Sequence, residues 1–290
     1  MTKPKTRRAF LQQSLVLGAG LALPNWAVAS AKPHKAKLML LHTNDFHSRL
    51  EPFPSNHKQW PNLGGIAGLG GSIIHERAKA DYHLLVDSGD VFQGTPYFNL
   101  YGGQPELEWM SQMGYAASTL GNHEFDNGIE HLISAHQQHA KFPLVNCNYT
   151  FSGEAFFKPY TIVERGPIRI GLTGVGINPD GLISERSMPG LGYTDPVQPL
   201  QNTVNHLRES EHCHLVFVLS HLGFQYDSGK IDDHKLAART HGIDAILGGH
   251  THTFLDKPVQ VKNAQNKAVI INQAGWAGLR LGKLEFEVRV

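Results

Sequence analysis

The sequence is poor in cysteine and has no long apolar run. Only Cys147 and Cys213 occur in 290 residues, too few for a disulfide-stapled scaffold. Both lie in or beside apolar stretches, so we expect two separate, buried and unreactive thiols. The longest N-terminal apolar stretch, residues 11–23, is interrupted by polar residues and is shorter than the ~20 residues that cross a bilayer. The sequence therefore predicts a globular protein without stable membrane insertion.

Neither sign of charge is in clear excess. The chain has 26 basic and 25 acidic residues. Residues 1–31 contain four of the basic residues and no acidic one, so the remainder has a net charge of −3 (22 basic against 25 acidic). A mildly acidic protein has no global field that attracts a nucleic acid polymer or an anionic membrane. An anionic substrate would need a local source of positive charge.

The first 31 residues resemble an export signal. Arg7 and Arg8 stand in the sequence Thr-Arg-Arg-Ala-Phe-Leu, which is similar to the twin-arginine signal, and small-residue cleavage sites follow the apolar stretch. We expect a twin-arginine-type signal peptide at 1–31, recognised by the twin-arginine export machinery, and a periplasmic or secreted domain at 32–290. The alternative is a disordered basic tail.

From residue 37 onward, short apolar runs alternate with amphipathic segments. Strands are predicted at Lys37–Leu41, His83–Val86, Pro143–Val145, Arg169–Thr173, Leu215–Leu219, Ala245–Leu247, Val269–Asn272 and Gly282–Val290. Helices are predicted at Ile66–Lys79, Ile129–His139 and Pro196–Ser210. Continuous apolar runs indicate strands buried on both faces, whereas the alternating last strand has one wet face. The alternation of strands and helices predicts a single α/β domain.

Polar, glycine-rich loops carry the residues that could bind metal ions. At the ends of predicted strands stand Asp45, His47, Asp90, Asn122, His221, His250 and His252. In an extended Asp-x-His or His-x-His both side chains project to the same side. These N and O ligands exceed the needs of one four-coordinate ion, and a shared carboxylate would let two divalent ions lie ~3.5–4 Å apart. Manganese, zinc, iron and cobalt all suit this set, and two such ions would supply the local positive charge.

Other polar residues have simpler interpretations. We expect His42 to be structural, and His212 and His214 not to bind metal, because no carboxylate or glycine-rich loop accompanies them. Glu124 is expected to orient its loop rather than react. Three histidines of a predicted helix are expected to form a solvated face: His131, His136 and His139.

The motifs taken in order resemble the calcineurin-like metallophosphoesterases. The order is Asp-x-His, Gly-Asp, Gly-Asn-His-Glu, His and Gly-His-x-His. Closer similarity to the 5′-nucleotidase branch lies in residues 42–45, 90–96, 121–127 and 272–275. The resemblance covers residues 38–290. It implies a four-layer α/β/β/α sandwich, with two mixed sheets and a dinuclear metal site at the C-terminal ends of the strands.

The resemblance also implies a role for each site residue. Asp45, His47 and His252 would hold one ion, and Asp90 would bridge both. The second ion would be held by Asn122, His221 and His250. His123 and Asp126 would form a catalytic dyad that assists in-line attack of a metal-bridging hydroxide on phosphorus.

The resulting hypothesis is an exported phosphomonoesterase of broad, nucleotidase-like specificity that acts on a small phosphorylated substrate. One alternative is a phosphodiesterase or pyrophosphatase acting on cyclic nucleotides or nucleotide sugars, and another is a non-catalytic metal-dependent binding protein. Two departures from the family's pattern argue against carrying its nucleotide specificity over to this chain. The family's second, C-terminal domain is expected to be missing after Val290, and Gly68 stands where many relatives have Arg. Five aromatic residues near the motifs are expected mainly to pack beneath the loops: Phe92, Tyr97, Phe98, Phe224 and Trp276.

Overall fold

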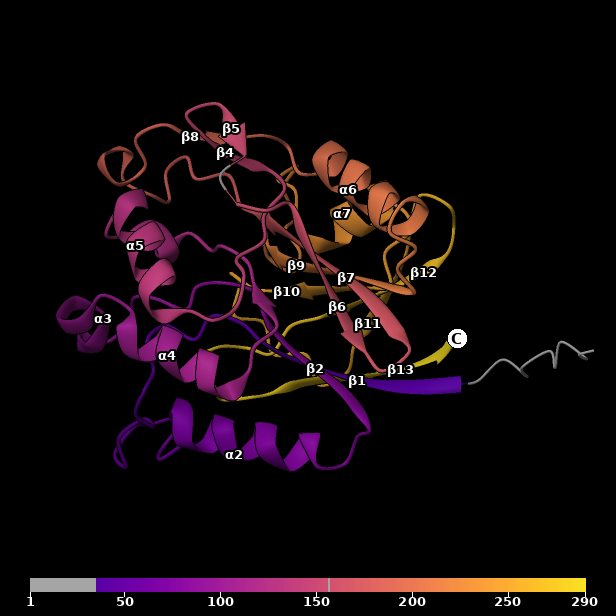
Figure 1. Ribbon diagram of the computed structural model, residues 1–290. Helices are drawn as coiled ribbons and strands as arrows, with labels where there is room; N and C mark the ends of the chain where they lie inside the picture. Colours follow the sequence, from indigo (N-terminus) through magenta and orange to yellow (C-terminus); the bar gives the residue numbers. More distant parts are fainter. Residues whose placement is uncertain (1–34, 156) are drawn as a thin grey trace, which may run out of the picture. The chain divides into compact units, whose positions relative to one another are not determined.

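A computed structural model describes residues 35–155 and 157–290. The predicted signal peptide lies outside the described residues. Apolar strands form two mixed sheets that face each other (Figure 1). The first sheet has the order β13-β1-β2-β3, in which β1 is parallel to β2 and β2 to β3. These strands are β13 (Gly282–Arg289), β1 (Lys35–Thr43), β2 (Tyr82–Asp87) and β3 (Ala117–Ser118).

The second sheet has a parallel centre and antiparallel edges. Its order is β11 (Val259–Lys262), β12 (Ala268–Asn272), β10 (Ala245–Gly248), β9 (Leu215–His221), β7 (Ile168–Gly176) and β6 (Tyr160–Arg165). Strand β9 is buried throughout, because sheet covers one face and helices cover the other. A small antiparallel sheet contains β5 (Glu154–Ala155), β4 (Tyr149–Phe151) and β8 (Leu191–Tyr193).

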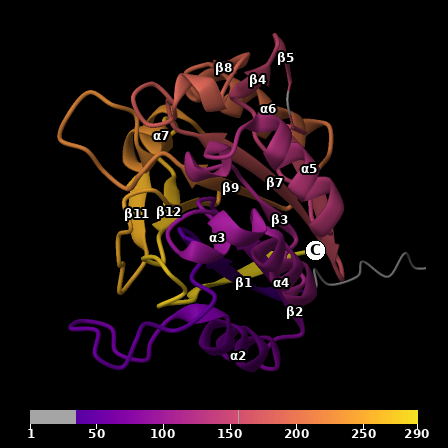
Figure 2. The same cartoon turned by 90° about the vertical axis from the view of Figure 1, so that its left-hand side faces the viewer.

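Helices cover the outer faces of both sheets (Figures 1 and 2). On the first sheet lie α2 (Gly65–Arg77), α4 (Gln104–Met113) and α5 (Ile129–His139), which share one core with Leu41 and Leu85. On the second lie α6 (Val197–Glu209) and α7 (Asp233–Arg239). Between the sheets, Leu40 and Leu84 share a core with Phe217. The predicted four-layer sandwich is therefore confirmed.

The burial of α6 follows from its sequence. Leu200, Val204 and Leu207 recur at helical spacing and are fully buried against the second sheet. Such a stripe holds an amphipathic helix on a sheet. In the part of the chain that the structure describes, the other helical segments are short, namely α3 (Pro96–Tyr101) and the 3₁₀ turns η1 (His123–Phe125) and η2 (Glu185–Ser187).

Most predicted elements are present, and one predicted strand is wrong. Pro143–Val145 forms only single bridges, Ser118 with Leu144 and Val145 with Lys158, and Pro143 has no N–H to extend a ladder. The alternating burial of β13 is confirmed. The sequence did not indicate α3, α4 or α7, nor six short strands (β3, β4, β5, β6, β8 and β11). Within the described ranges no helix combines the length and the apolar character needed to cross a membrane.

Candidate metal centre

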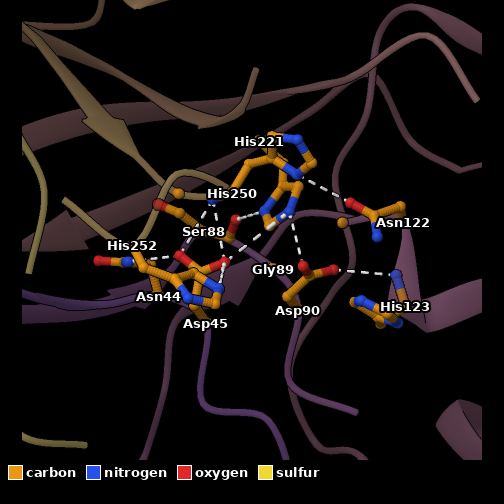
Figure 3. Close-up of polar contacts among 12 residues, drawn as sticks. Asn44, Asp45, Ser88, Gly89, Asp90, Asn122, His123, His221, His250 and His252 are labelled. Atoms are coloured by element: carbon orange, nitrogen blue, oxygen red, sulfur yellow. Dashed lines mark hydrogen bonds and ion pairs between the residues drawn. The ribbon is translucent and has the colours of Figure 1, made fainter. Parts of the chain in front are cut away.

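The parallel strands of both sheets deliver the predicted ligands to one place. Asp45 follows β1, Asp90 follows β2 and Asn122 follows β3, while His221 ends β9 and His250 follows β10. Figure 3 shows these side chains pointing toward one another. Ligand sites commonly lie at the carboxyl ends of parallel strands. Here two sheets contribute their ends to the same site.

The prediction of extended Asp-x-His and His-x-His segments is wrong. Asp45 and His47 have φ of 51° and 52°, and His250 and His252 have φ of 71° and 51°. The loop after β1 turns sharply because it is bonded to the loop after β2, with the Asp45 N–H donating to the Gly89 carbonyl at 2.9 Å. In the loop after β10, where His250 and His252 have positive φ, His250 lies next to Asn122 and His252 lies next to His47.

The first group of potential ligands consists of Asp45, His47 and His252. The Nε2 atoms of the two histidines lie 2.9 Å apart. Asp45 Oδ1 lies 3.9 Å from His47 Nε2 and 3.5 Å from His252 Nε2. Asp45 and His47 are buried. Two imidazoles and a carboxylate that converge in this way form a donor set suited to a divalent transition-metal ion.

The second group consists of Asp90, His221 and His250. His221 Nδ1 lies 2.7 Å from the Ser88 carbonyl, to which it donates. Its other ring nitrogen, Nε2, is buried and makes no hydrogen bond, although it lies 3.0 Å from Asp90 Oδ2 and 4.0 Å from Asp45 Oδ1. A buried ring nitrogen aimed at two carboxylates fits a metal ligand whose tautomer is fixed by the backbone.

Electrostatics at this group favour a cation between the carboxylates. Burial alone would lower the pKa of His221, but the charge of Asp90 and its contact raise it to about 10. Burial opposes ionisation of Asp90, yet His221 and His47 hold the pKa of Asp90 well below its usual value. By contrast, burial and then the neighbouring His221 lower the pKa of His250 to about 4. Asp90 thus retains its negative charge in a buried site.

Asp90 adjoins both groups. Its Oδ2 atom lies 3.0 Å from His221 Nε2 and 3.9 Å from His47 Nε2. Its Oδ1 atom accepts a hydrogen bond from the His123 backbone N–H at 2.9 Å. Asp90, His47 and His123 also form a third cluster of potential ligand atoms. Asp90 is therefore the described carboxylate best placed for sharing.

His123 pairs with Asp126, as the family resemblance implies. His123 Nδ1 lies 2.8 Å from Asp126 Oδ2. This hydrogen bond raises the pKa of His123, while burial opposes the increase and Asp90 adds to it. The His123 side chain is 35% exposed. It is thus both positioned and accessible.

Glu124 holds the loops together, which confirms its expected orienting role. Its buried carboxylate accepts backbone hydrogen bonds from Asp90, Val91 and Gly121 at 2.9, 2.8 and 2.5 Å. A longer one comes from Phe92 at 3.4 Å. Burial and the Asp90 charge raise the pKa of Glu124 to about 7, and these N–H donors counteract that rise.

Sequence reasoning missed two residues that support the ligands. The Asn44 side chain donates to Asp45 Oδ2 at 2.6 Å and to the Gly275 carbonyl at 2.6 Å. Gln273 donates to the Gly249 carbonyl at 2.7 Å, next to His250. Both lie within motif segments, which is the signal that could have identified them.

Histidines outside the site give a mixed outcome. His42 is structural as expected, because it is buried and pairs with Asn272 at 2.9 Å between the two sheets. The expected solvated face is wrong. His131 and His136 are half-buried with Nε2 at 2.8 and 2.7 Å from backbone carbonyls, and His139 Nδ1 lies 3.0 Å from Glu108.

The remaining expectations concern the cysteines and two further histidines. Cys147 and Cys213 are free, as expected, and burial raises the pKa of each thiol, to about 12 for Cys147. His212 and His214 are exposed, and among the described residues neither belongs to a cluster of potential ligands.

The aromatic residues near the site divide into two kinds. Phe92 and Phe98 are buried and stack on each other beneath the loops, as expected. Trp276 is half-buried and lies parallel to the His252 ring, with centroids 5.3 Å apart and planes at 5°. Packing beneath a loop therefore does not describe Trp276.

Comparison with known proteins agrees with this geometry. Residues 38–254 match the calcineurin-like phosphoesterase family. The chain is 31% identical over 280 residues to a snake venom 5′-nucleotidase of Crotalus adamanteus, with 89% of this chain and 46% of that protein covered. It is 32% identical over 313 residues to a 5′-nucleotidase of Homo sapiens, with 99% and 51% covered. The chain thus spans about half the length of these relatives.

Two solved structures extend the comparison. A 5′-nucleotidase precursor from Thermus thermophilus has a TM-score of 0.76 and 34% identity, covering 86% of this chain and 51% of that one. A calcineurin-like phosphoesterase from Bacillus subtilis has a TM-score of 0.75 and 25% identity, covering 88% and 86%. Both similarities extend over most of the sandwich described above.

Proposed function

Since the chain belongs to the calcineurin-like phosphoesterase family, we propose that it hydrolyses phosphate monoesters at the metal centre. The observation that carries the proposal is the position of Asp90. Its carboxylate adjoins both ligand groups and also the backbone of His123. One side chain thus links the two metal positions to the proposed catalytic histidine.

Each ligand has a proposed position. Asp45, His47 and His252 would hold one divalent ion, with Asp90 shared. The other ion would be held by Asn122, His221 and His250. The mixed N and O set suits manganese, zinc, iron or cobalt. When bound, two such ions supply Lewis-acid activation of water and positive charge that binds phosphate.

His123 and Asp126 would supply the proton chemistry. Because Nδ1 of His123 is bonded to Asp126, Nε2 is the ring nitrogen left to face a substrate oxygen. The Asp126 carboxylate favours the protonated imidazole, which stabilises charge on the phosphoryl group and donates a proton to the leaving oxygen. The backbone bond from His123 to Asp90 keeps this donor at a fixed place beside the ligands.

Weak discrimination between leaving groups is part of the proposal. Phe92 and Phe98 are fully buried, so neither offers a free ring face to a nucleoside base. Strong rejection of analogues requires buried partners for the distinguishing group. Small phosphomonoesters should therefore have kcat/KM within about tenfold of AMP, which corresponds to ~1.4 kcal/mol. A preference of more than about a thousandfold for one nucleotide would contradict this.

Phosphate release from the metal-loaded protein tests the activity. AMP, a sugar phosphate and an aryl phosphate would be compared with a phosphodiester and a nucleotide sugar across a series of divalent ions. We expect turnover of the monoesters, its loss on chelation and close to two ions per active chain. Turnover confined to the diester or the nucleotide sugar would replace the monoesterase by a phosphodiesterase or pyrophosphatase. A fully loaded protein that hydrolyses no ester would indicate a binding protein.

Export by the twin-arginine machinery to the periplasm or medium completes the proposal. Its support is the sequence around Arg7 and Arg8, outside the described residues. Replacing both with Lys keeps the positive charge but removes the paired arginines, so the precursor should remain in the cytoplasm. Cell fractionation measures this, and unchanged export would contradict the twin-arginine assignment.

A further inference from the structure

We propose that Trp276 is a positioning residue that orients His252 toward the first metal position. This inference rests on the proposed function, because it concerns a ligand of the proposed centre. The indole and imidazole planes differ by 5°, with ring centroids 5.3 Å apart. The same indole makes a T-shaped contact with the His47 ring, with centroids 6.4 Å apart and planes at 69°. Trp276 therefore contacts both histidines of the first ligand group.

His252 needs such support more than the other histidines near it. His47 and His221 each have Nδ1 fixed by a backbone carbonyl, at 3.2 Å from Gln93 and 2.7 Å from Ser88. For His252 no bond from Nδ1 to another described residue is present, and its side chain is 39% exposed against 10% for His47. A metal-binding histidine usually has its second nitrogen fixed by a partner. Stacking on Trp276 fixes the ring plane in its place.

Trp276 is itself held rigidly enough to act as a support. The next residue, Ala277, has φ of 57° and donates its N–H to the Asp45 carbonyl at 2.8 Å. Phe53 packs edge-on against the indole at 5.6 Å and 68°. The loop that carries Trp276 is thus tied to the backbone of a second ligand, Asp45. The indole and the first metal position belong to one connected unit.

The orienting role predicts an effect on one ion and not on the other. Trp276→Ala should lower the affinity for the ion at Asp45, His47 and His252 by about tenfold, which is within the range for losing a partner that orients a ligand. The ion near His221 should keep its affinity. Trp276→Phe retains an aromatic face and should stay within about threefold of the natural protein.

Chelator competition on the Co²⁺-loaded full chain tests this prediction. Visible absorption of Co²⁺ and elemental analysis after desalting would count the ions retained at each chelator concentration. We expect Trp276→Ala to release one ion at about tenfold lower chelator, and the second ion at the same concentration as the natural protein. Circular dichroism would verify that each variant is folded.

Trp60→Ala is the matched control. Trp60 is also half-buried and stacks on an aromatic ring, Phe254, at 5.5 Å, and among the described residues it has no ring contact with a proposed ligand. Its release curve should match the natural protein. The positioning role would be overturned if Trp276→Ala weakened the binding of both ions to the same extent. It would also be overturned if Trp60→Ala weakened metal binding as much as Trp276→Ala does, because either result would show a general structural effect.

The two proposals fail in different ways. If the natural protein retains two ions and Trp276→Ala releases both at the same chelator concentrations as the natural protein does, the positioning role is wrong and the metal centre stands. If the natural protein retains no ion, the metal centre is wrong and the positioning role is wrong with it. If both ions bind and respond as expected but no ester is hydrolysed, the proposed activity alone fails.

Discussion

The Glu124 carboxylate accepts a hydrogen bond from the backbone N–H of Asp90, with 2.9 Å between Glu124 Oε2 and the Asp90 nitrogen. The same carboxylate accepts from Val91 and Gly121. One buried side chain thereby joins the loop after β2 to the loop after β3. The Asp90 side chain owes its position to a residue that is itself not a proposed ligand.

Replacing Glu124 with Gln tests this relationship. Gln replaces one of the two carboxylate oxygens with an NH₂ group that cannot accept, so the buried backbone N–H groups bonded to that oxygen lose their acceptor. We expect the free energy of unfolding to fall by ~1–3 kcal/mol, with a lower affinity for both ions. Denaturant titration and elemental analysis measure these effects. Glu130→Gln, at an exposed position on α5, should cost less than ~1 kcal/mol. Equal behaviour of the two variants would contradict the role of Glu124.

His123→Ala should lower turnover by ~10²–10⁴-fold, as expected for loss of a proton donor or charge stabiliser. Metal content should be kept, because the bond to Asp90 comes from the His123 backbone and survives the substitution. Steady-state kinetics on a substrate with a poor leaving group would measure the turnover, and parallel metal analysis would measure the metal content. Asp126→Asn should reduce turnover less and also retain metal. Full turnover by His123→Ala would exclude the dyad.

Asp90→Ala should lose both ions and activity together. Its carboxylate adjoins both ligand groups, at 3.0 Å from His221 Nε2 and 3.9 Å from His47 Nε2. Elemental analysis after desalting would show less than one ion per chain, whereas Asp126→Asn should keep two. Retention of two tightly bound ions by Asp90→Ala would mean that Asp90 is not shared.

Gly121→Ala should disrupt the centre without removing any ligand. A Cβ at Gly121 would lie 2.1 Å from Asp90 Oδ1 and 2.6 Å from the Asp90 nitrogen, so Asp90 must move. We expect ~1–3 kcal/mol of destabilisation and weaker metal binding. Gly68→Ala is the control, because nothing lies within 4 Å of its Cβ in helix α2, and it should stabilise the protein by up to ~1 kcal/mol. Normal metal binding by Gly121→Ala would show that the loop adapts.

The sequence by itself indicated the alternation of strands and helices and the candidate ligand set. Long apolar runs such as β9 and the stripe on α6 specify burial locally, so their positions follow from periodicity alone. Asp45, Asp90 and His221 could be identified because each stands at or just beyond the end of such a run. Short elements escaped prediction: β3 has two residues, and a two-residue strand exists only through its pairing with β2.

Only the tertiary structure decided how the backbone turns between the candidate ligands and which residues hold them in place. The His-x-His segment has left-handed backbone, which sends His250 toward Asn122 and His252 toward His47. Local sequence does not fix that turn, because contacts between distant loops impose it, such as the His250 N–H donating to the Asp45 carboxylate at 3.0 Å. Trp276 and His252 likewise meet only because β10 and β12 lie side by side in one sheet. Residue types fix which atoms are available for binding, and chain packing fixes which of them converge.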